Sequence, residues 1–352
     1  MVTLRATDIA AVDLFCGAGG LSYGLQQAKI PVVAGIDIDK RCAYPFESNI
    51  GSPFLQADVR DISSDDLAPF WSHAKYRILA GCAPCQPFST HRRGANTSAE
   101  RAWPLVGEFG RIVRESLPEF VTMENVVGLR HKEPFHKLVD LLTTLGYSVD
   151  YANCFAPRYG LAQNRRRLVL VGSRISDISV PQGHLAPEQF RTVRQAIGGL
   201  PALGSGESSA DDRLHVARSL TDLNLRRIRA SVPGGTWQDW PESLRSNCHL
   251  KESGSSFRSV YSRMEWDNPS PTITTQFFNF GTGRFGHPEQ DRTLTLREAA
   301  ILQGFPKKYR FVRPKDPVEF HPLGRLIGNA VPPRLAKAVG KAIISSINEA
   351  AA

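Results

Sequence analysis

The chain has 352 residues, of which 41% are hydrophobic, enough for one large or two ordinary globular domains. No apolar run approaches the ~20 residues of a membrane-spanning helix, and the N-terminus lacks a basic-then-apolar signal pattern. We therefore expect an intracellular, cytoplasmic protein without a membrane partner. There are 43 Lys and Arg against 34 Asp and Glu, a formal net charge of +9, which favours a polyanionic partner such as nucleic acid.

The first half of the sequence alternates short apolar runs with amphipathic stretches. The expected strands are AAVDLF, PVVAGID, SPFLQAD, YRILAG, EFVTMEN, YSVDYANCF and RLVLVGS. Between several of them lie helical patterns, such as PLVGEFGRIVRESL and PFHKLVDLLTTLG. This alternation predicts an α/β fold with a doubly wound, mostly parallel sheet.

The sequence changes character after about residue 174. LGSGESSADD reads as a loop, and arginines then cluster with tryptophans. We expect short helices, strands and Gly-rich loops there. The last segment is predicted to be helical after Pro333.

Three successive strand ends carry groups that suit an adenosyl cofactor. DLFCGAGG (13–20) places glycines where a strand turns into a helix, which lets a ligand approach the backbone. Asp37 follows about 20 positions later, where a ribose is usually held, whereas Asp39 reads as a surface acid or helix cap. Asp58 ends the third strand and could accept a hydrogen bond from an adenine amino group. The glycine turn is not a dinucleotide fingerprint, so a cofactor without a diphosphate is favoured.

GCAPCQPFST (81–90) follows the fourth strand and contains a C-x-x-C pair, Cys82 and Cys85. A disulfide scaffold is not expected at this length in a reducing compartment, and a four-ligand zinc site would need a second pair that is absent. We therefore predict no metal. A thioredoxin-like helix would be interrupted by Pro87. A nucleophile needs an acid and a charge-stabilising partner nearby. Glu124, at the end of the next strand, could supply the acid.

The segment LAQNRRRLVLVG brings Gln163, Arg165 and Arg167 to the start of another strand. We expect these residues at the same sheet edge as Cys85 and Glu124. Taken singly, Glu124 could cap a helix and the arginines could be surface charges. Together, these residues indicate a catalytic site at one edge of the sheet.

These residues resemble the C5-cytosine-specific DNA methyltransferase family. The matching segments are DLFCGAGG, GIDID, ADV, GCAPCQPFS, RIVRESLPEF, MENV, QNRRR, PSPTIT and GNAVPP, and they cover nearly the whole chain except about 175 to 255. The resemblance implies a Rossmann-like S-adenosylmethionine-dependent catalytic domain, 1–173 plus 326–352, and a target-recognition, DNA-binding domain, 174–325. S-adenosylhomocysteine would be the product.

The resemblance also implies roles for individual residues. The cofactor pocket would comprise Phe15, Gly17, Gly19, Leu21, Asp37, Ile38, Asp58, Val59, Pro84, Leu105, Asn329 and Ala330. At position 38 many members have an aromatic residue, so one adenine contact differs here. Cys85 would add to C6 of cytosine and Glu124 would act at N3. Arg167 would bind O2, and Arg165 would support Glu124.

Residues flanking the nucleophile have further expected roles. His91, Arg92 and Arg93 could touch phosphates as the loop of about 86–100 closes over DNA, and Cys82 is interpreted as a packed structural thiol. Candidates for phosphate or guanine contacts are Arg218, Arg226, Arg227, Arg229, Arg258 and Arg284.

The expected partner is double-stranded DNA, with a paired restriction endonuclease as a further candidate, and the enzyme is expected to be a monomer associated with the nucleoid in a bacterium. Three alternatives remain: RNA cytosine methylation, a thiol oxidoreductase built on Cys82 and Cys85, and a catalytically inactive DNA-binding module.

Overall fold

The computed structural model describes residues 8–84, 99–247, 249–251 and 260–350. The chain divides into two compact units: the first unit comprises 1–159, 166–184 and 330–352, and the second comprises 160–165 and 185–329. The sequence-based boundaries are 173 and 325, whereas the compact units divide at 184 and 329, and residues 160–165 belong to the second unit. No helix in the described ranges is long and apolar enough to cross a membrane.

The first unit is built on a seven-stranded sheet in the order β3-β2-β1-β4-β5-β7-β6. The strands are β1 Ile9–Leu14, β2 Val32–Asp37, β3 Phe54–Gln56, β4 Tyr76–Gly81, β5 Phe120–Asn125, β6 Ser148–Phe155 and β7 Arg166–Ser173. All seven expected strands are present. Strand β7 alone runs antiparallel to its neighbours β5 and β6, so the sheet is mostly parallel, as predicted. The start of β7 therefore lies at the edge where the other strands end.

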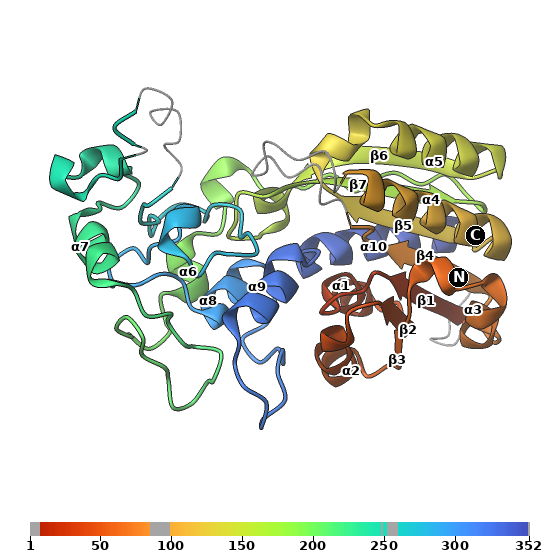
Figure 1. The fold of residues 1–352 in the computed structure, drawn as a ribbon. Coiled ribbons are helices and arrows are strands. Elements are labelled where there is room, and N and C mark those ends of the chain that lie inside the picture. The colour runs from red at the N-terminus through yellow and green to blue at the C-terminus, as the bar shows by residue number, and fades with distance from the viewer. Residues whose placement is uncertain (1–7, 85–98, 248, 252–259, 351–352) are drawn as a thin grey trace. The chain divides into compact units, whose positions relative to one another are not determined.

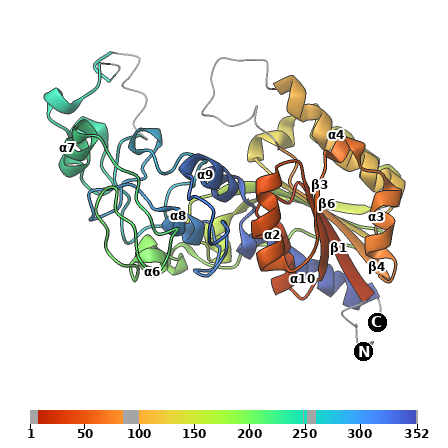
Figure 2. The same ribbon diagram turned by 60° about the horizontal axis from the view of Figure 1, so that its bottom comes forward.

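Helices cover both faces of this sheet (Figures 1 and 2). The helices are α1 Gly20–Gln27, α2 Ala43–Ile50, α3 Ser64–Trp71, α4 Ala99–Ser116, α5 Glu133–Thr144 and α10 Pro333–Ala350. One apolar core joins the sheet to α1, α2 and α10, and another joins it to α3, α4 and α5. Successive strand residues alternate between these cores: Ala11 lies in the first and Val12 in the second. The sheet is thus buried on both faces, as a parallel sheet requires.

The C-terminal helix α10 packs closely on α1, near the other end of the chain. Glycines permit this approach: a Cβ at Gly340 would stand 2.6 Å from the Cβ of Ala28, and a Cβ at Gly24 would overlap Ala336 and the carbonyl of Pro333. The prediction of a helix after Pro333 is confirmed. Both ends of the chain therefore build the first unit.

The second unit contains short helices joined by long loops. The helices are α6 Val193–Ile197, α7 Asp222–Ala230, α8 Leu296–Leu302 and α9 Phe320–Asn329. The expectation of strands in this region is wrong for the part that the structure describes, where only isolated bridges form, such as Gln163 with Ser270. The loops instead bond through side chains, which local sequence patterns do not specify.

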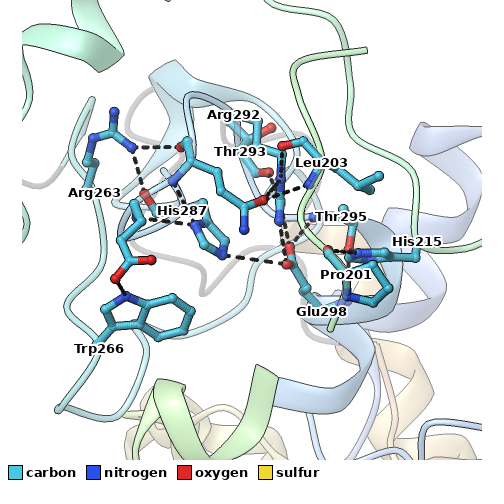
Figure 3. Close-up of polar contacts among 12 residues, drawn as sticks. Pro201, Leu203, His215, Arg263, Trp266, His287, Arg292, Thr293, Thr295 and Glu298 are labelled. Carbon is cyan, nitrogen blue, oxygen red and sulfur yellow. Dashed lines mark hydrogen bonds and ion pairs between the residues drawn. The ribbon is translucent and has the colours of Figure 1, made fainter. Parts of the chain in front are cut away.

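A buried polar network organises this unit (Figure 3). Arg292 makes two hydrogen bonds of 2.7 Å to the carboxylate of Glu298, at the start of α8. Thr295 caps the same helix, and its backbone N–H donates to Glu298. The ring of His215 contacts the Thr295 hydroxyl at 3.1 Å and the Pro201 carbonyl at 2.8 Å. Buried charges are tolerated here because each has close partners.

Candidate active site

The turn after β1 exposes backbone at the carboxyl edge of the sheet. Phe15, Gly17 and Gly19 have positive φ angles of 57°, 53° and 84°, and Gly19 is the N-cap of α1. A Cβ at Gly17 would have nothing within 4 Å, so the space above this turn is open. Leu21 is buried in the first turn of the helix. The turn leaves room for a ligand against the backbone.

Asp37, the last residue of β2, connects this turn to the next one. One carboxylate oxygen accepts a hydrogen bond of 3.0 Å from the Gly17 N–H, and the other accepts one of 2.9 Å from the Asp39 N–H. Burial raises the pKa of Asp37, and the two backbone hydrogen bonds oppose that shift. Asp39 caps the helical turn Lys40–Cys42, as the sequence indicated.

Asp13 is an acidic residue at this edge that sequence reasoning left without a role. Its side chain is fully buried in β1, and one oxygen accepts a hydrogen bond of 2.5 Å from the Ser22 hydroxyl. Burial raises its pKa to about 7. The other oxygen, Oδ1, has no hydrogen-bond partner among the described residues. Its signal in the sequence is an acid inside an otherwise apolar strand.

The adjoining strand ends carry the residues expected around an adenine. Ile38 is 63% exposed, the largest exposure among the large hydrophobic side chains of the described chain. Asp58 caps the turn Val59–Asp61 and accepts hydrogen bonds of 3.0 Å from the backbone and Nε of Arg60. Val59 is buried. The Asp58 carboxylate thus already has an internal partner.

Other residues of the predicted pocket lie on different elements. Pro84 is exposed beyond the end of β4, and Leu105 is half-buried in α4. Asn329 ends α9 and belongs to the second unit, whereas its neighbour Ala330 belongs to the first and is buried.

Glu124 lies near the end of β5, with charged and thiol partners on its two oxygens. Arg167, from the start of β7, brings Nε to 3.1 Å from Oε1. The Cys82 sulfur lies 3.2 Å from Oε2. The Glu124 side chain is only 6% exposed, so the ion pair is shielded from solvent. The family resemblance implied that Arg165 supports Glu124; the structure shows Arg167 as a direct partner.

Gln163 and Arg165 belong to the second unit and hydrogen-bond to its backbone. The Gln163 amide donates to the Leu302 carbonyl at 3.0 Å and accepts from the Ile273 N–H at 3.0 Å. The buried Arg165 guanidinium donates to the carbonyls of Ile273 and Gly328. The two side chains therefore hydrogen-bond to backbone groups at the end of α8, at Ile273 and near the end of α9.

Several expected residues lie outside the described part of the chain: Cys85, His91, Arg92, Arg93 and Arg258. Upstream of them, the described chain shows how the segment begins. The Cys82 N–H donates to the Leu14 carbonyl at 3.3 Å, and the buried Asn125 amide donates to the Ala83 carbonyl at 3.0 Å. The start of the Cys85 segment is therefore attached to β1 and β5.

The candidate DNA-contacting arginines of the second unit differ in their surroundings. Arg227 is buried; it donates to the Leu244 carbonyl and Ser246 hydroxyl and stacks over the Trp240 and Tyr261 rings, which identifies it as a structural residue. Arg229 pairs with Asp291, and Arg218 donates to Asn279. Arg226 is exposed, and the Nε of Arg284 is buried with no hydrogen-bond partner in the described ranges.

Comparisons with known proteins give the family. The sequence model described as C-5 cytosine-specific DNA methylase matches residues 9–345. The type II methylase M.HgiDII of Herpetosiphon aurantiacus is 45% identical over 337 residues, covering 95% of this chain and 94% of the relative. Methyltransferase M1.HphI of Haemophilus parahaemolyticus is 32% identical over 343 residues, covering 96% and 87%.

Solved structures share the fold. A prophage-encoded protein of Escherichia coli, described as a DNA modification methyltransferase, superposes with a TM-score of 0.74 at 23% identity, over 97% of this chain and 99% of the other. The S. pombe Dnmt2 methyltransferase gives 0.59 at 17% identity, over 97% and 98%. With strand ends that present a glycine turn, Asp37 and a buried Glu124–Arg167 pair, the chain belongs to the C-5 cytosine-specific DNA methylase family and is a DNA (cytosine-5-)-methyltransferase.

Proposed function

We propose that the first unit binds S-adenosylmethionine and that the enzyme methylates C5 of a cytosine flipped out of double-stranded DNA, with Cys85 as the nucleophile. The proposal rests on the arrangement of side chains at one edge of the sheet, where the parallel strands end. The Gly17–Asp37 contact and the Glu124–Arg167 pair lie at the ends of β1, β2 and β5 and at the start of β7.

The residues at the ends of β1 and β2 fit this cofactor. The open turn at Gly17 would receive its methionine part, and Asp37 would hold the ribose hydroxyls. The exposed Ile38 side chain offers an apolar face for the adenine. The buried oxygen of Asp13, which lacks a described partner, supports a ligand that carries hydrogen-bond donors or positive charge. When bound, S-adenosylmethionine supplies an electrophilic methyl group on a sulfonium and leaves as S-adenosylhomocysteine.

The side chains of the enzyme would make C5 of cytosine nucleophilic. The Cys85 thiolate adds to C6, because addition across the C5–C6 bond places electron density on C5. Glu124, in its protonated carboxylic acid form, donates a hydrogen bond to N3 and relieves the charge that develops on the ring. Arg167 forms an ion pair with Glu124 and is assigned to O2 of the cytosine. After methylation, a base removes the C5 proton, the C5–C6 double bond re-forms and Cys85 leaves as thiolate.

DNA recognition is assigned to the second unit. The target carbon is stacked inside a duplex, so the cytosine must be extruded, which costs a few kcal/mol. We retain the proposal that 1–173 with 326–352 is catalytic and that 174–325 recognises the target. A net charge of +9 supports binding to phosphates.

DNA containing 5-fluorocytosine tests the mechanism, because a fluorine at C5 cannot leave as a proton. With S-adenosylmethionine present, we expect a denaturation-resistant protein–DNA band on a gel. Cys85→Ser should not trap DNA, since a hydroxyl is far less ionised than a thiol near neutral pH. Cys82→Ala should still trap.

A band that survives Cys85→Ser, or that disappears with a folded Cys82→Ala, would refute Cys85 as the nucleophile, and the latter would favour a role for the C-x-x-C pair. Parallel assays on duplex DNA and on tRNA distinguish DNA methylation from RNA methylation. Methyl transfer confined to tRNA would exclude the proposed substrate.

A further inference from the structure

The contact between Cys82 and Glu124 is not explained by the packed structural role that the sequence suggested for Cys82. The sulfur lies 3.2 Å from Oε2 of Glu124, within range of an S–H to carboxylate hydrogen bond. The residue follows β4 directly, and its backbone N–H is fixed on the Leu14 carbonyl. Because β4 and β5 are adjacent parallel strands, with Gly81 opposite Met123, this geometry places position 82 beside Glu124.

The two oxygens of Glu124 have different partners from the two strands that flank β5. Arg167 approaches Oε1 from β7, and Cys82 approaches Oε2 from the end of β4. Oε1 has no well-aligned hydrogen bond among the described residues, so the ion pair with Arg167 constrains the carboxylate less than its distance alone suggests. The thiol is then the directional donor that sets the rotation of the carboxylate.

The thiol is protonated at neutral pH and can donate. Burial and the nearby Glu124 charge raise the pKa of Cys82 well above its ordinary value. Cys82 is thus a poor nucleophile and a competent, if weak, hydrogen-bond donor.

We propose that Cys82 is a positioning residue for methyl transfer: its S–H holds the Glu124 carboxylate in the orientation that meets the cytosine ring. This inference rests on the proposed role of Glu124. It assigns the two cysteines of the C-x-x-C pair different tasks, with Cys85 as nucleophile and Cys82 as the donor that orients the acid.

Single-turnover methylation of duplex DNA at saturating S-adenosylmethionine tests the proposal. Cys82→Ala should lower the rate constant about fivefold to tenfold, as expected for losing one weak donor to a charged group. Separate steady-state measurements should give unchanged KM values for DNA and cofactor. Cys82→Ser restores a donor and should recover at least half of the wild-type rate.

Cys154→Ala is the matched control. Cys154 is a buried cysteine of the same apolar core, with its sulfur directed at the Ala152 carbonyl. If Cys82 only fills space, Cys82→Ala and Cys154→Ala should both lower the melting temperature and leave the rate constant alone. That result, or a Cys82→Ser variant as slow as Cys82→Ala, would overturn the positioning role.

Glu124→Gln separates this inference from the proposed function. A slow Glu124→Gln together with a wild-type rate for Cys82→Ala refutes only the role of Cys82. A wild-type rate for Glu124→Gln would refute the role of Glu124 itself, and the Cys82 proposal with it.

Discussion

The backbone N–H of Gly17 donates a hydrogen bond of 3.0 Å to the carboxylate of Asp37, which stands 20 residues later in the chain. The same carboxylate accepts from the Asp39 N–H at 2.9 Å. One side chain therefore orders the turns that follow two adjacent strands, β1 and β2. A ribose held by Asp37 would lie beside the open backbone of Gly17, so ligand binding and turn geometry depend on the same group.

Replacing Asp37 with alanine should weaken binding of S-adenosylmethionine. The variant loses the acceptor for the ribose, and each hydrogen bond to a charged group contributes about 1.5–3 kcal/mol, or roughly 10-fold to 150-fold in affinity. Isothermal titration calorimetry measures the change. Asp39→Ala is the control: Asp39 caps the next helical turn and pairs with Arg41, so its affinity should stay close to wild type. Equal affinities for Asp37→Ala and wild type would remove Asp37 from the site.

The close packing of α1 on α10 should make Gly24 intolerant of any side chain. The Cβ of Gly24→Ala would overlap Ala336 and the backbone carbonyl of Pro333, and overpacking of this kind costs about 1–3 kcal/mol. Gly107→Ala is the opposite case, because Gly107 lies exposed in α4 with open space around it, and alanine should stabilise the helix by about 0.5–1 kcal/mol. Urea denaturation reports both. A destabilising Gly107→Ala or a neutral Gly24→Ala would contradict the described packing.

The sheet was predictable from sequence because its strands are buried on both faces and read as short apolar runs. The helical spacing of Phe135, Leu138 and Leu142 likewise predicts α5, where all three are buried. The direction of β7 has no such local signal, although it is what brings Arg167 to Glu124.

The second unit was less predictable because long-range side-chain contacts hold it together. Arg297, for example, makes hydrogen bonds to the carboxylate of Asp212, 85 residues earlier in the chain, and local sequence patterns do not specify this contact. The first unit has a contact of the same kind: Cys82 and Glu124 lie 42 residues apart in the chain, and their contact depends on the order of strands in the sheet. Sequence motifs identified Cys82 and Glu124, but only the fold shows that the two side chains touch.

DNA binding should weaken steeply as the salt concentration rises, because cationic side chains that bind phosphates displace the counterions bound to DNA. Arg226 is exposed on α7, and Arg226→Ala should reduce the slope of log affinity against log salt by about one if it contacts a phosphate. Arg227→Ala should instead lower the melting temperature, since Arg227 is buried against Trp240 and Tyr261. Fluorescence anisotropy at several salt concentrations gives the slope. A flat plot for the wild type would argue against phosphate binding.

His287 should make the folded protein sensitive to mild acid. Its Nδ1 accepts hydrogen bonds from the N–H groups of Glu289 and Gln290, and its Nε2 lies 3.9 Å from Glu298 (Figure 3). Burial lowers the pKa of His287 from 6.5 to about 4, with nearby arginines acting in the same direction and Glu298 opposing. Between these values the unfolded chain binds a proton that the folded chain does not, so stability falls as the pH falls.

The size of the effect follows from the pKa difference. From pH 7 to pH 5 the His287 contribution to the unfolding free energy should decrease by about 2 kcal/mol, given about 1.4 kcal/mol per pKa unit. Urea denaturation across this range should therefore show a shallower loss of stability for His287→Gln than for wild type, even though the variant is less stable at pH 7. The exposed His73, changed to Gln, is the control and should keep the wild-type slope. Parallel slopes for wild type and His287→Gln would mean that His287 takes up its proton at the same pH in the folded and the unfolded chain, which would contradict a lowered pKa in the fold.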